Sequence, residues 1–491
     1  MKSGMEMYAG SISPECFPRA AEYAGLGIFQ RPLLREKKQF RQIPDFSERH
    51  LQCIWFDARW RPSIMQTSSG EEVRVEDPGI WNLEAGPDFL GAALRVGTGN
   101  RRIRGDVEIH VHPSDWKQHG HAEDRRYAQV KAHVTFFPGV PEPTLFPPGV
   151  IHVALKNELL SNPLFSFENV DITAYPMSAR CTEPPCRRVI SAWTPEARMR
   201  FMEAAGEERL RRKAERMAAS IREKGVDQAL YEEIMCALGY KGNKQPFRIL
   251  AERIPFQHLH ALDAFKAYAL LLGVSGLLPE NVEKKWDEET REFVRAIWDT
   301  WWKIRGTWEK KLLTRSDWQL NGLRPANHPI RRLMAAAHLF TAEKPLAERL
   351  DELIHGSTEL LAEKVEKIFR IEAGAYWERR WALSGKPTPE PVALLGPSRI
   401  TAIHLNVILP FAAAAGLPMR ELLRQIPTEP ANLVIKQTAW NLFGPDQAES
   451  LYRQGLRQQG LTQIFYDFCM NDRSRCEECF LPQMLEAGKK A

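Results

Sequence analysis

The chain has 491 residues, of which 44% are hydrophobic and 26% charged, and it carries a formal net charge of +5. This length exceeds what one compact core usually holds, so we expect two or three domains. The composition is that of a globular protein and excludes a disordered or fibrous chain. The small excess of basic residues permits nucleic acid as a partner without requiring it.

The sequence predicts a cytoplasmic protein without membrane segments. Its longest apolar stretches, 267–278 and 405–417, are too short or interrupted by proline to span a bilayer. The first ten residues lack the apolar core of a signal peptide. In this setting we expect the eight cysteines to be reduced thiols or metal ligands rather than disulfides.

Short strands are predicted in the first 190 residues. Glycine- and proline-rich turns separate five segments in which apolar and polar side chains alternate, a pattern typical of strands with one buried face. These segments span 71–75, 91–96, 106–112, 128–137 and 149–155. We therefore predict a β-rich domain over residues 1–190.

A helical pattern begins at residue 194. Thr194 is a suitable N-cap and Pro195 fits the first helical position, where its missing N–H costs nothing. Further helical patterns occupy 227–240, 289–304, 327–340, 358–371 and 446–460. We predict an α+β protein in which a mostly α-helical domain, residues 191–491, follows the β-rich domain and ends in a cysteine cluster at 465–480.

The stretch 86–112 reads as a hairpin. Its turn at 97–100, Gly-Thr-Gly-Asn, tolerates the positive φ of tight turns and pairs Asp88 with Glu108, give or take one residue. Side chains alternate along a strand, so one face carries the polar residues and the other packs inward. The polar face holds Asp106, Glu108, His110 and His112, and the inward face holds Val107, Ile109 and Val111.

This hairpin resembles the core of the PD-(D/E)xK nuclease superfamily. Pro87 and Asp88 match the first element, Glu108 matches the second acidic ligand, and His110 stands where the superfamily has lysine. Two carboxylates on adjacent strands suit Mg²⁺ or Mn²⁺. We therefore predict Asp88, Glu108 and His110 as catalytic residues, with Asp88 and Glu108 as metal ligands and His110 orienting water or stabilising charge.

Two other interpretations of the histidines stay open. His110 and His112 on one strand, with His119, His121, His133 and His152 available nearby, resemble a cupin-like site for Zn²⁺, Fe²⁺ or Mn²⁺, although the glutamate at the cupin spacing is missing. The same histidines could instead be structural residues that form a polar network. For any one histidine the structural interpretation is favoured, but for the whole cluster it is not.

A second candidate site lies near the C-terminus. Cys469, Cys476 and Cys479 form a C-x6-C-x2-C pattern, and the C-x2-C spacing lets two thiolates bind one metal. Zn²⁺ and an iron–sulfur cluster both fit this pattern. Cys181, Cys186 or a histidine is available as a fourth ligand. We predict a structural metal site that fixes the tail.

Over nearly its whole length the chain resembles an uncharacterised bacterial family, the domain of unknown function 2851 family. The stretches that carry the resemblance include NLEAGPDFLGAAL, GDVEIHVHPSDWKQHGH, DRRYAQVKAHV, EERLRRKAERM, ALGYKGNKQPF, GLRPANHPIRRL, HLNVILPF and the terminal CEEC. The resemblance implies that further residues belong to one feature with Glu108 and His110: Asp106, Trp116, His121, Asp124 and His133. His112 is less typical of the family, which favours the carboxylate-centred site.

These patterns together predict a metal-dependent phosphodiester hydrolase with a nuclease-like N-terminal domain. His121 and His133 are expected to be metal ligands or to support the ligands, and the helical domain is expected to hold a nucleic-acid substrate. The competing prediction is a non-catalytic nucleic-acid-binding or scaffold protein, in which the same residues form a polar network.

Overall fold

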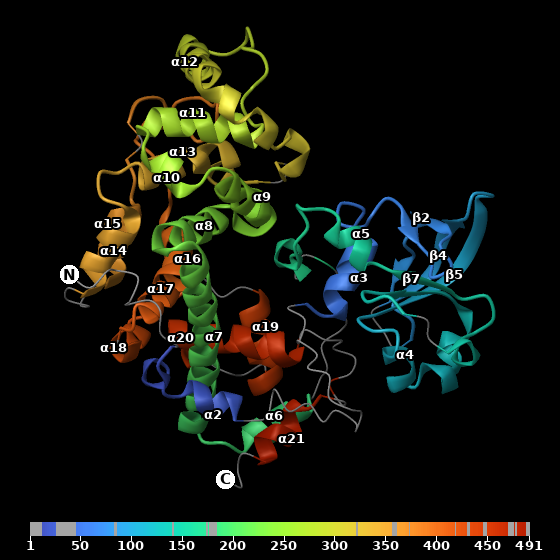
Figure 1. Ribbon diagram of the computed structural model, residues 1–491. Coiled ribbons are helices and arrows are strands. Elements are labelled where there is room, and N and C mark those ends of the chain that lie inside the picture. The colour runs from blue at the N-terminus through green and yellow to red at the C-terminus, as the bar shows by residue number, and fades with distance from the viewer. Residues whose placement is uncertain are drawn as a thin grey trace. The chain divides into compact units, whose positions relative to one another are not determined.

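The computed structural model describes residues 12–25, 46–82, 86–139, 142–172, 175, 184–320, 323–355, 361–372, 374–417, 419–429, 433–444, 449–469, 476 and 479–487 (Figure 1). The chain forms two compact units, and neither is continuous in sequence. The sheet unit comprises residues 26–193, 436–446 and 464–491, and the helical unit comprises residues 1–25, 194–435 and 447–463. The α+β class predicted from the sequence is confirmed.

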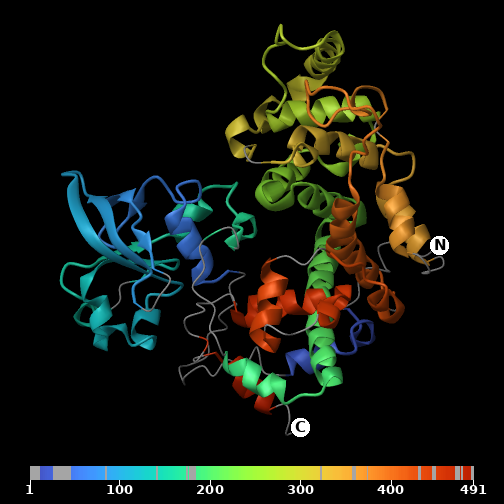
Figure 2. The ribbon, with the colours of Figure 1, turned by 180° about the vertical axis from the view of Figure 1, so that it is seen from behind.

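A seven-stranded mixed sheet forms the centre of the sheet unit (Figure 2). Its strands are β1 (Met65–Gln66), β2 (Glu72–Asp77), β3 (Ile80–Trp81), β4 (Phe89–Val96), β5 (Arg101–His110), β6 (Val130–Thr135) and β7 (Ile151–Ala154). The order is β1-β2-β4-β5-β6-β7, with β3 beside β4. A bridge between Thr67 and Val153 nearly closes the sheet. All five predicted strands are present.

The predicted hairpin is formed by β4 and β5. Phe89 pairs with Val107, so Asp88 lies at the level of Glu108 as the turn predicts. Val107 and Ile109 are 0% and 1% exposed, which confirms their inward face. The opposite face is also buried at this end of β5, because Glu108 and His110 are only 4% and 0% exposed.

The chain leaves β5 through short helices and returns to pair in parallel with it as β6. These helices are α4 (Asp115–Gln118), η2 (His121–Glu123) and η3 (Arg125–Gln129). Trp116, Tyr127 and Val130 form a buried cluster, and the Trp116 indole N–H donates to the Leu145 carbonyl at 2.9 Å. This cluster holds the segment between β5 and β6 against the sheet.

Further helices of the sheet unit flank this core. They are α3 (Glu48–Phe56), η4 (Pro143–Leu145), α5 (Lys156–Leu160), η5 (Phe167–Asn169), α6 (Pro185–Ser191), η14 (Phe465–Cys469) and α21 (Leu481–Ala487). Helix α3 contacts β5, and α6 contacts α21. None of these helices was expected individually, although η14 and α21 lie within the α-helical domain predicted for residues 191–491.

The helical unit is built around α7 (Pro195–Lys224). Thr194 caps this helix as predicted, because its hydroxyl accepts the Ala197 N–H at 3.3 Å. The other main helices are α2 (Ala20–Ala24), α8 (Val226–Leu238), α9 (Tyr240–Arg253), α10 (Phe256–His260), α11 (Ala264–Ser275), α12 (Glu288–Ile304), α13 (Pro329–Phe340), α14 (Leu346–His355), α15 (Leu361–Phe369), α16 (Pro397–Ile403), α17 (Leu409–Ala414), α18 (Met419–Arg424), α19 (Leu433–Phe443), whose last eight residues belong to the sheet unit, and α20 (Gly455–Ile464).

Helix α20 crosses α7 at a glycine contact. A Cβ on Gly206 would lie 2.2 Å from the Leu456 carbonyl oxygen, so only glycine permits this close approach. The predicted helix over 446–460 is shorter than expected, since a 3-10 turn at Glu449–Tyr452 precedes α20. Within the described residues, every helix is too short or too polar to cross a membrane.

Candidate metal centre

Four polar side chains meet at the C-terminal end of β5. Glu108 and His110 share one face of the strand, because they are two residues apart. The segment after β5 brings His119 and His121 back to the same place, with Gly120 between them at a φ of +70° that favours glycine. We call Glu108, His110, His119 and His121 the His–Glu group.

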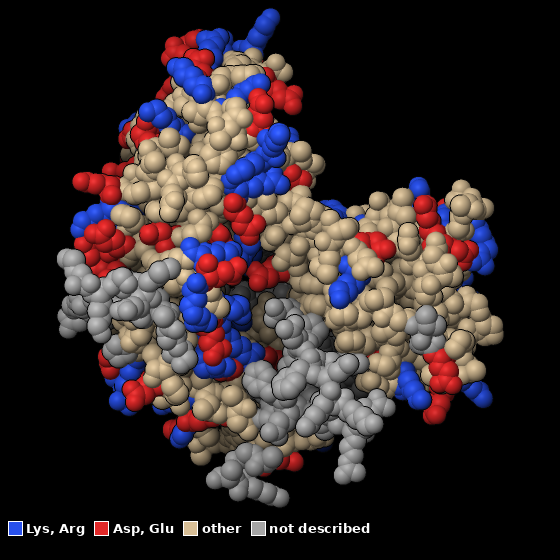
Figure 3. Space-filling model, in the orientation of Figure 1, with Lys and Arg blue, Asp and Glu red and all other residues tan. Residues whose placement is uncertain are grey.

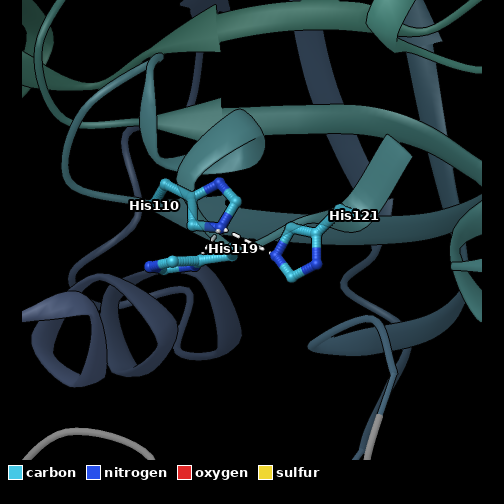
Figure 4. Close-up of side chains that lie close together, drawn as sticks. All are labelled: His110, His119 and His121. Carbon is cyan, nitrogen blue, oxygen red and sulfur yellow. Dashed lines mark hydrogen bonds between the residues drawn. The ribbon is translucent and has the colours of Figure 1, made fainter. Parts of the chain in front are cut away.

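The three imidazoles point toward one another (Figure 4). His110 Nε2 lies 3.2 Å from His121 Nε2 and 3.2 Å from His119 Nδ1. The ligand atoms of these three histidines all lie within 4.8 Å of one another. His110 and His121 are buried, whereas His119 is exposed. The group is therefore closed by the sheet on one side and reaches solvent at His119.

The Glu108 carboxylate completes a nearly equilateral triangle with two imidazoles. Glu108 Oε1 lies 3.3 Å from His110 Nε2 and 3.1 Å from His121 Nε2, and the two nitrogens are 3.2 Å apart. A tetrahedral ion with bonds of about 2.0 Å separates its ligand atoms by about 3.3 Å. The three atoms therefore have the spacing of one face of a tetrahedral metal site.

Two further histidines lie on the other side of the His110 ring, next to its Nδ1 atom. His110 Nδ1 lies 2.9 Å from His133 Nε2, and His133 Nδ1 lies 3.4 Å from His152 Nδ1. Parallel pairing explains the first contact, because β6 places His133 beside Glu108 of β5. His133 is 1% exposed, whereas His152 is half-buried. A row of imidazoles thus runs from the His–Glu group toward the surface.

The charge states follow from burial and from these contacts. Burial raises the pKa of Glu108, but the hydrogen bonds and charges of His110 and His121 outweigh it and hold this pKa at about 2. Burial lowers the pKa of His110, but Glu108 outweighs that effect and the net shift is upward. Burial, reinforced by the charge of His110, lowers the pKa of His133 to about 2. Glu108 is therefore ionised and His133 is neutral at neutral pH.

Asp88 contacts Glu108 through the backbone. Its N–H donates to Glu108 Oε2 at 3.1 Å. Its carboxylate accepts the Ile109 N–H at 2.8 Å through Oδ2 and the Gln52 amide at 2.7 Å through Oδ1. Asp88 thus connects the start of β4 to β5 and to α3. Its link to the imidazole nitrogens runs through Glu108. Its predicted role as a metal ligand stays a prediction.

The family resemblance also implied that Asp106, Trp116 and Asp124 belong to the site. These three residues make different kinds of contact. The Trp116 ring is 5.2 Å from the His121 ring and 5.5 Å from the His133 ring. Asp106 accepts the Gly91 N–H at 2.9 Å, and Asp124 accepts the Arg126 N–H at 3.0 Å. His112 lies elsewhere, stacked on Phe137 at 4.6 Å. His110 and His112 therefore lie in different surroundings, although the sequence places them two residues apart.

Gln52 is the contact that sequence analysis missed. It lies on α3, and the alternation and turn patterns that identified the hairpin carry no information about a helix 36 residues earlier. Glu48 on the same helix raises the pKa of His110 through its charge, although burial of His110 and the nearby Glu108 have larger effects on that pKa.

The predicted cysteine ligands lie in the sheet unit. Cys469 ends η14, and Cys476 and Cys479 are half-buried, with the Cys479 N–H 3.3 Å from the Cys476 carbonyl oxygen. Burial raises the pKa of Cys186 to about 12, and the charges of Cys479 and Cys476 contribute to this shift. Cys181 lies outside the described residues.

A family model described as "Protein of unknown function (DUF2851)" matches residues 48–423 of the chain. This match covers the whole sheet and the His–Glu group, and it ends before the three C-terminal cysteines. No curated protein and no solved structure matches the chain.

Proposed function

We propose that the chain, which belongs to the DUF2851 family of proteins of unknown function, is a metal-dependent hydrolase that cleaves phosphodiesters. The observation that carries the proposal is the triangle of Glu108 Oε1, His110 Nε2 and His121 Nε2, with sides of 3.1–3.3 Å. Comparison with known proteins identifies the family and leaves its activity open, so the site alone supports the function.

A metal site explains the contacts of His110 better than a structural polar network does. One Nε2 atom faces His121, His119 and Glu108 at 3.2–3.3 Å, and an imidazole nitrogen carries at most one hydrogen. Hydrogen bonding alone therefore satisfies one of these contacts well. A divalent cation satisfies all of the converging lone pairs together, and its charge matches the ionised Glu108.

The donor set favours a particular kind of metal. Three imidazole nitrogens and one carboxylate oxygen suit Zn²⁺, Fe²⁺ or Mn²⁺, whereas Mg²⁺ prefers oxygen ligands and keeps most of its water. Of the two ions predicted from the carboxylates, Mn²⁺ is thus favoured over Mg²⁺. When bound, such an ion would supply Lewis-acid chemistry and would help to activate a water molecule as a nucleophile at neutral pH.

The surrounding residues have roles that follow from their contacts. Asp88 positions β5 and Glu108, as its bonds to Ile109 N and Glu108 Oε2 indicate. His133 holds the ring of His110 from behind and fixes which of its nitrogens faces the group. Half-buried His152 continues this contact and gives a proton a route between His133 and solvent.

A group of basic side chains on the helical unit supports an anionic substrate. The pKa of Lys213 is lowered well below its usual value by burial, by Arg209 and Arg216, and to a lesser extent by Lys244, while the carboxylate of Glu429 opposes this shift. Such mutual repulsion is relieved when phosphate groups bind. Figure 3 shows Lys and Arg side chains interspersed with acidic ones over the helical unit. The same group would serve a non-catalytic nucleic-acid-binding protein.

Cleavage of mixed single- and double-stranded DNA and RNA tests the proposal, with Mn²⁺, Zn²⁺, Fe²⁺ or Mg²⁺ added in turn. Wild type is compared with Glu108→Gln and with Glu142→Gln, which makes the same change at an exposed residue outside the group. We expect metal-dependent cleavage by wild type and Glu142→Gln, and loss of cleavage in Glu108→Gln. Binding of nucleic acid by all three proteins without cleavage would instead support the non-catalytic alternative.

A further inference from the structure

A lysine of the helical unit, Lys213 on α7, has neutral hydrogen-bond partners. Lys213 is half-buried, and its Nζ donates to Asn406 Oδ1 at 2.7 Å and lies 3.5 Å from Gln459 Oε1. In the described part of the chain, no carboxylate forms an ion pair with this ammonium. The positive charge of the protonated side chain is therefore not matched by a counter-ion within contact distance.

A second cation points to the same oxygen atom. Arg209 lies four residues before Lys213, and its Nε donates to Gln459 Oε1 at 3.1 Å. The two positive groups therefore converge on one neutral acceptor, close enough for one phosphate group to touch both. Exposed Arg216, three residues after Lys213, continues the same helix face. Like charges at these spacings repel each other, and an anion bound between them would relieve the repulsion.

The neighbouring cations of α7 are neutralised in a different way. Arg211 donates through Nε to Glu208 Oε2 at 2.6 Å and also forms an ion pair with Glu215. Arg212 donates through Nε to Glu208 Oε1 at 2.8 Å. Lys213 has amide oxygens in place of such carboxylates. The same stretch of helix thus contains cations with acidic partners and one whose partners are uncharged.

Gln459 adds a hydrogen-bond donor beside the two cations. This side chain is 7% exposed, and no described residue accepts a hydrogen bond from its Nε2. Its helix, α20, is pressed against α7, since a Cβ on the adjacent Gly460 would lie 1.9 Å from the Met202 carbonyl oxygen. The amide is therefore fixed in place, and its Nε2 is available to an oxygen of a bound anion.

Asn406 lies in an interruption of regular helix geometry. It belongs to the π-helical turn η12 (His404–Ile408), which joins α16 to α17. Such turns within helices are frequent at functional sites. Its Nδ2 donates to the Ala402 carbonyl at 2.7 Å, which fixes its Oδ1 toward Lys213. The Asn406 side chain therefore positions the ammonium and does not neutralise it.

We propose that Arg209, Lys213 and Gln459, with Asn406 positioning the lysine, form a phosphate-binding site on the helical unit. The planar guanidinium binds two oxygens of a phosphate side by side, and the ammonium adds a point charge. The ligand is a phosphate group, which either a small phosphate ester or a nucleic-acid backbone supplies. Binding does not rest on the proposed hydrolase activity, because the site uses different residues and no metal.

Calorimetric titration of the full chain in EDTA tests the site without any metal at the His–Glu group. The probes are sodium pyrophosphate and a short single-stranded DNA without terminal phosphates. Wild type is compared with Lys213→Gln and with Arg211→Gln, a control that removes one positive charge from the same stretch of helix. We expect affinity to fall by at least about 10-fold in Lys213→Gln, because a charged hydrogen-bond partner is lost. We expect the control to bind like wild type.

The two probes distinguish the sources of the phosphate. Binding of pyrophosphate alone identifies a small phosphate ester, and binding of DNA that pyrophosphate displaces identifies the backbone. Absence of binding of both probes to wild type overturns the site. Equal loss in Lys213→Gln and Arg211→Gln also overturns it, because it indicates a diffuse charge effect. Loss of cleavage with binding retained concerns the hydrolase alone.

Lysine acetylation of wild type gives a second readout that needs no variant to fold. The protein is treated with an N-hydroxysuccinimide ester of acetic acid, with and without saturating probe, and the modified lysines are mapped by mass spectrometry. We expect the bound probe to protect Lys213 and to leave Lys224, which pairs with Glu232 at 2.7 Å on the same helix, unaffected. Equal modification of Lys213 with and without the probe contradicts the proposal.

Discussion

Both units bury strongly polar side chains, and they do so in opposite ways. Arg331 and Arg332 of the helical unit are 0% and 3% exposed, yet their guanidiniums donate mainly to backbone oxygens. The acceptors are the carbonyls of Arg380, Val392, Ala393 and Leu394 and the Asn327 side chain. Buried His110, His121 and His133 of the sheet unit instead converge on one another and on Glu108. Burial of a charged group therefore says little about function, whereas the direction of its polar atoms distinguishes a structural network from a ligand set.

Removing a ligand gives the largest effect that this comparison predicts. Glu108→Gln keeps the shape of the side chain but removes the only carboxylate of the His–Glu group, so we expect metal affinity to fall by at least about 100-fold. We expect any cleavage activity of the variant to fall together with its metal affinity. Calorimetric titration with Zn²⁺ or Mn²⁺ measures the change, and unaltered affinity would place the metal elsewhere.

Removing a buried arginine affects stability and not metal binding. Arg331→Met leaves several buried carbonyls without their donor, so we expect the free energy of unfolding to fall by about 3 kcal/mol. The exposed residue Arg295, whose side chain is 58% accessible, gives the control Arg295→Met. Urea denaturation measures the difference. A loss of metal from folded Arg331→Met would contradict the division between the two networks.

His133→Phe tests the supporting contact behind His110. The ring is kept, but the nitrogen 2.9 Å from His110 Nδ1 is lost. We expect metal affinity to fall by about 10- to 100-fold, less than for Glu108→Gln, because supporting partners orient a ligand without supplying it. A loss as large as that of Glu108→Gln would indicate that His133 is itself a ligand, as the sequence first suggested.

His50 is a buried histidine outside both networks and gives the smallest effect. Its Nδ1 accepts the Ser47 N–H at 3.2 Å, and burial lowers its pKa to about 4. Below pH 6.5 the unfolded chain binds a proton at His50, whereas the folded chain binds it only near pH 4. The free energy of unfolding therefore falls as the pH falls from 6.5 toward 4. Between pH 7 and 5.5 we expect a loss of about 1 kcal/mol. His50→Gln abolishes this share of the pH dependence in urea denaturation at the two pH values.

The hairpin and its register could be predicted because both depend on local chemistry. Glycines at 97 and 99 define the turn, and alternation from Val107 to Ile109 defines the inward face. The same reasoning placed Asp88 beside Glu108. Thr194 and Pro195 fixed the start of α7 in the same local way.

The remaining contacts of the site depend on distant pairing and could not be read from the sequence. His133 reaches His110 because β6 returns in parallel, and neither strand specifies this direction by itself. The place of His119 depends on Gly120 and on the packing of Trp116. Gln52 meets Asp88, and α6 meets α21, across long sequence separations.

The most direct test of the metal centre is X-ray absorption spectroscopy of zinc bound at one equivalent to the variant Cys476→Ser with Cys479→Ser. This variant lacks the C-x2-C unit, so zinc reports on the His–Glu group. We predict imidazole scattering and ligands at about 2.0 Å with no sulfur, and the loss of this signal when Glu108→Gln is added. Weak binding without imidazole ligands, or a spectrum that Glu108→Gln leaves unchanged, would contradict a metal site at the end of β5.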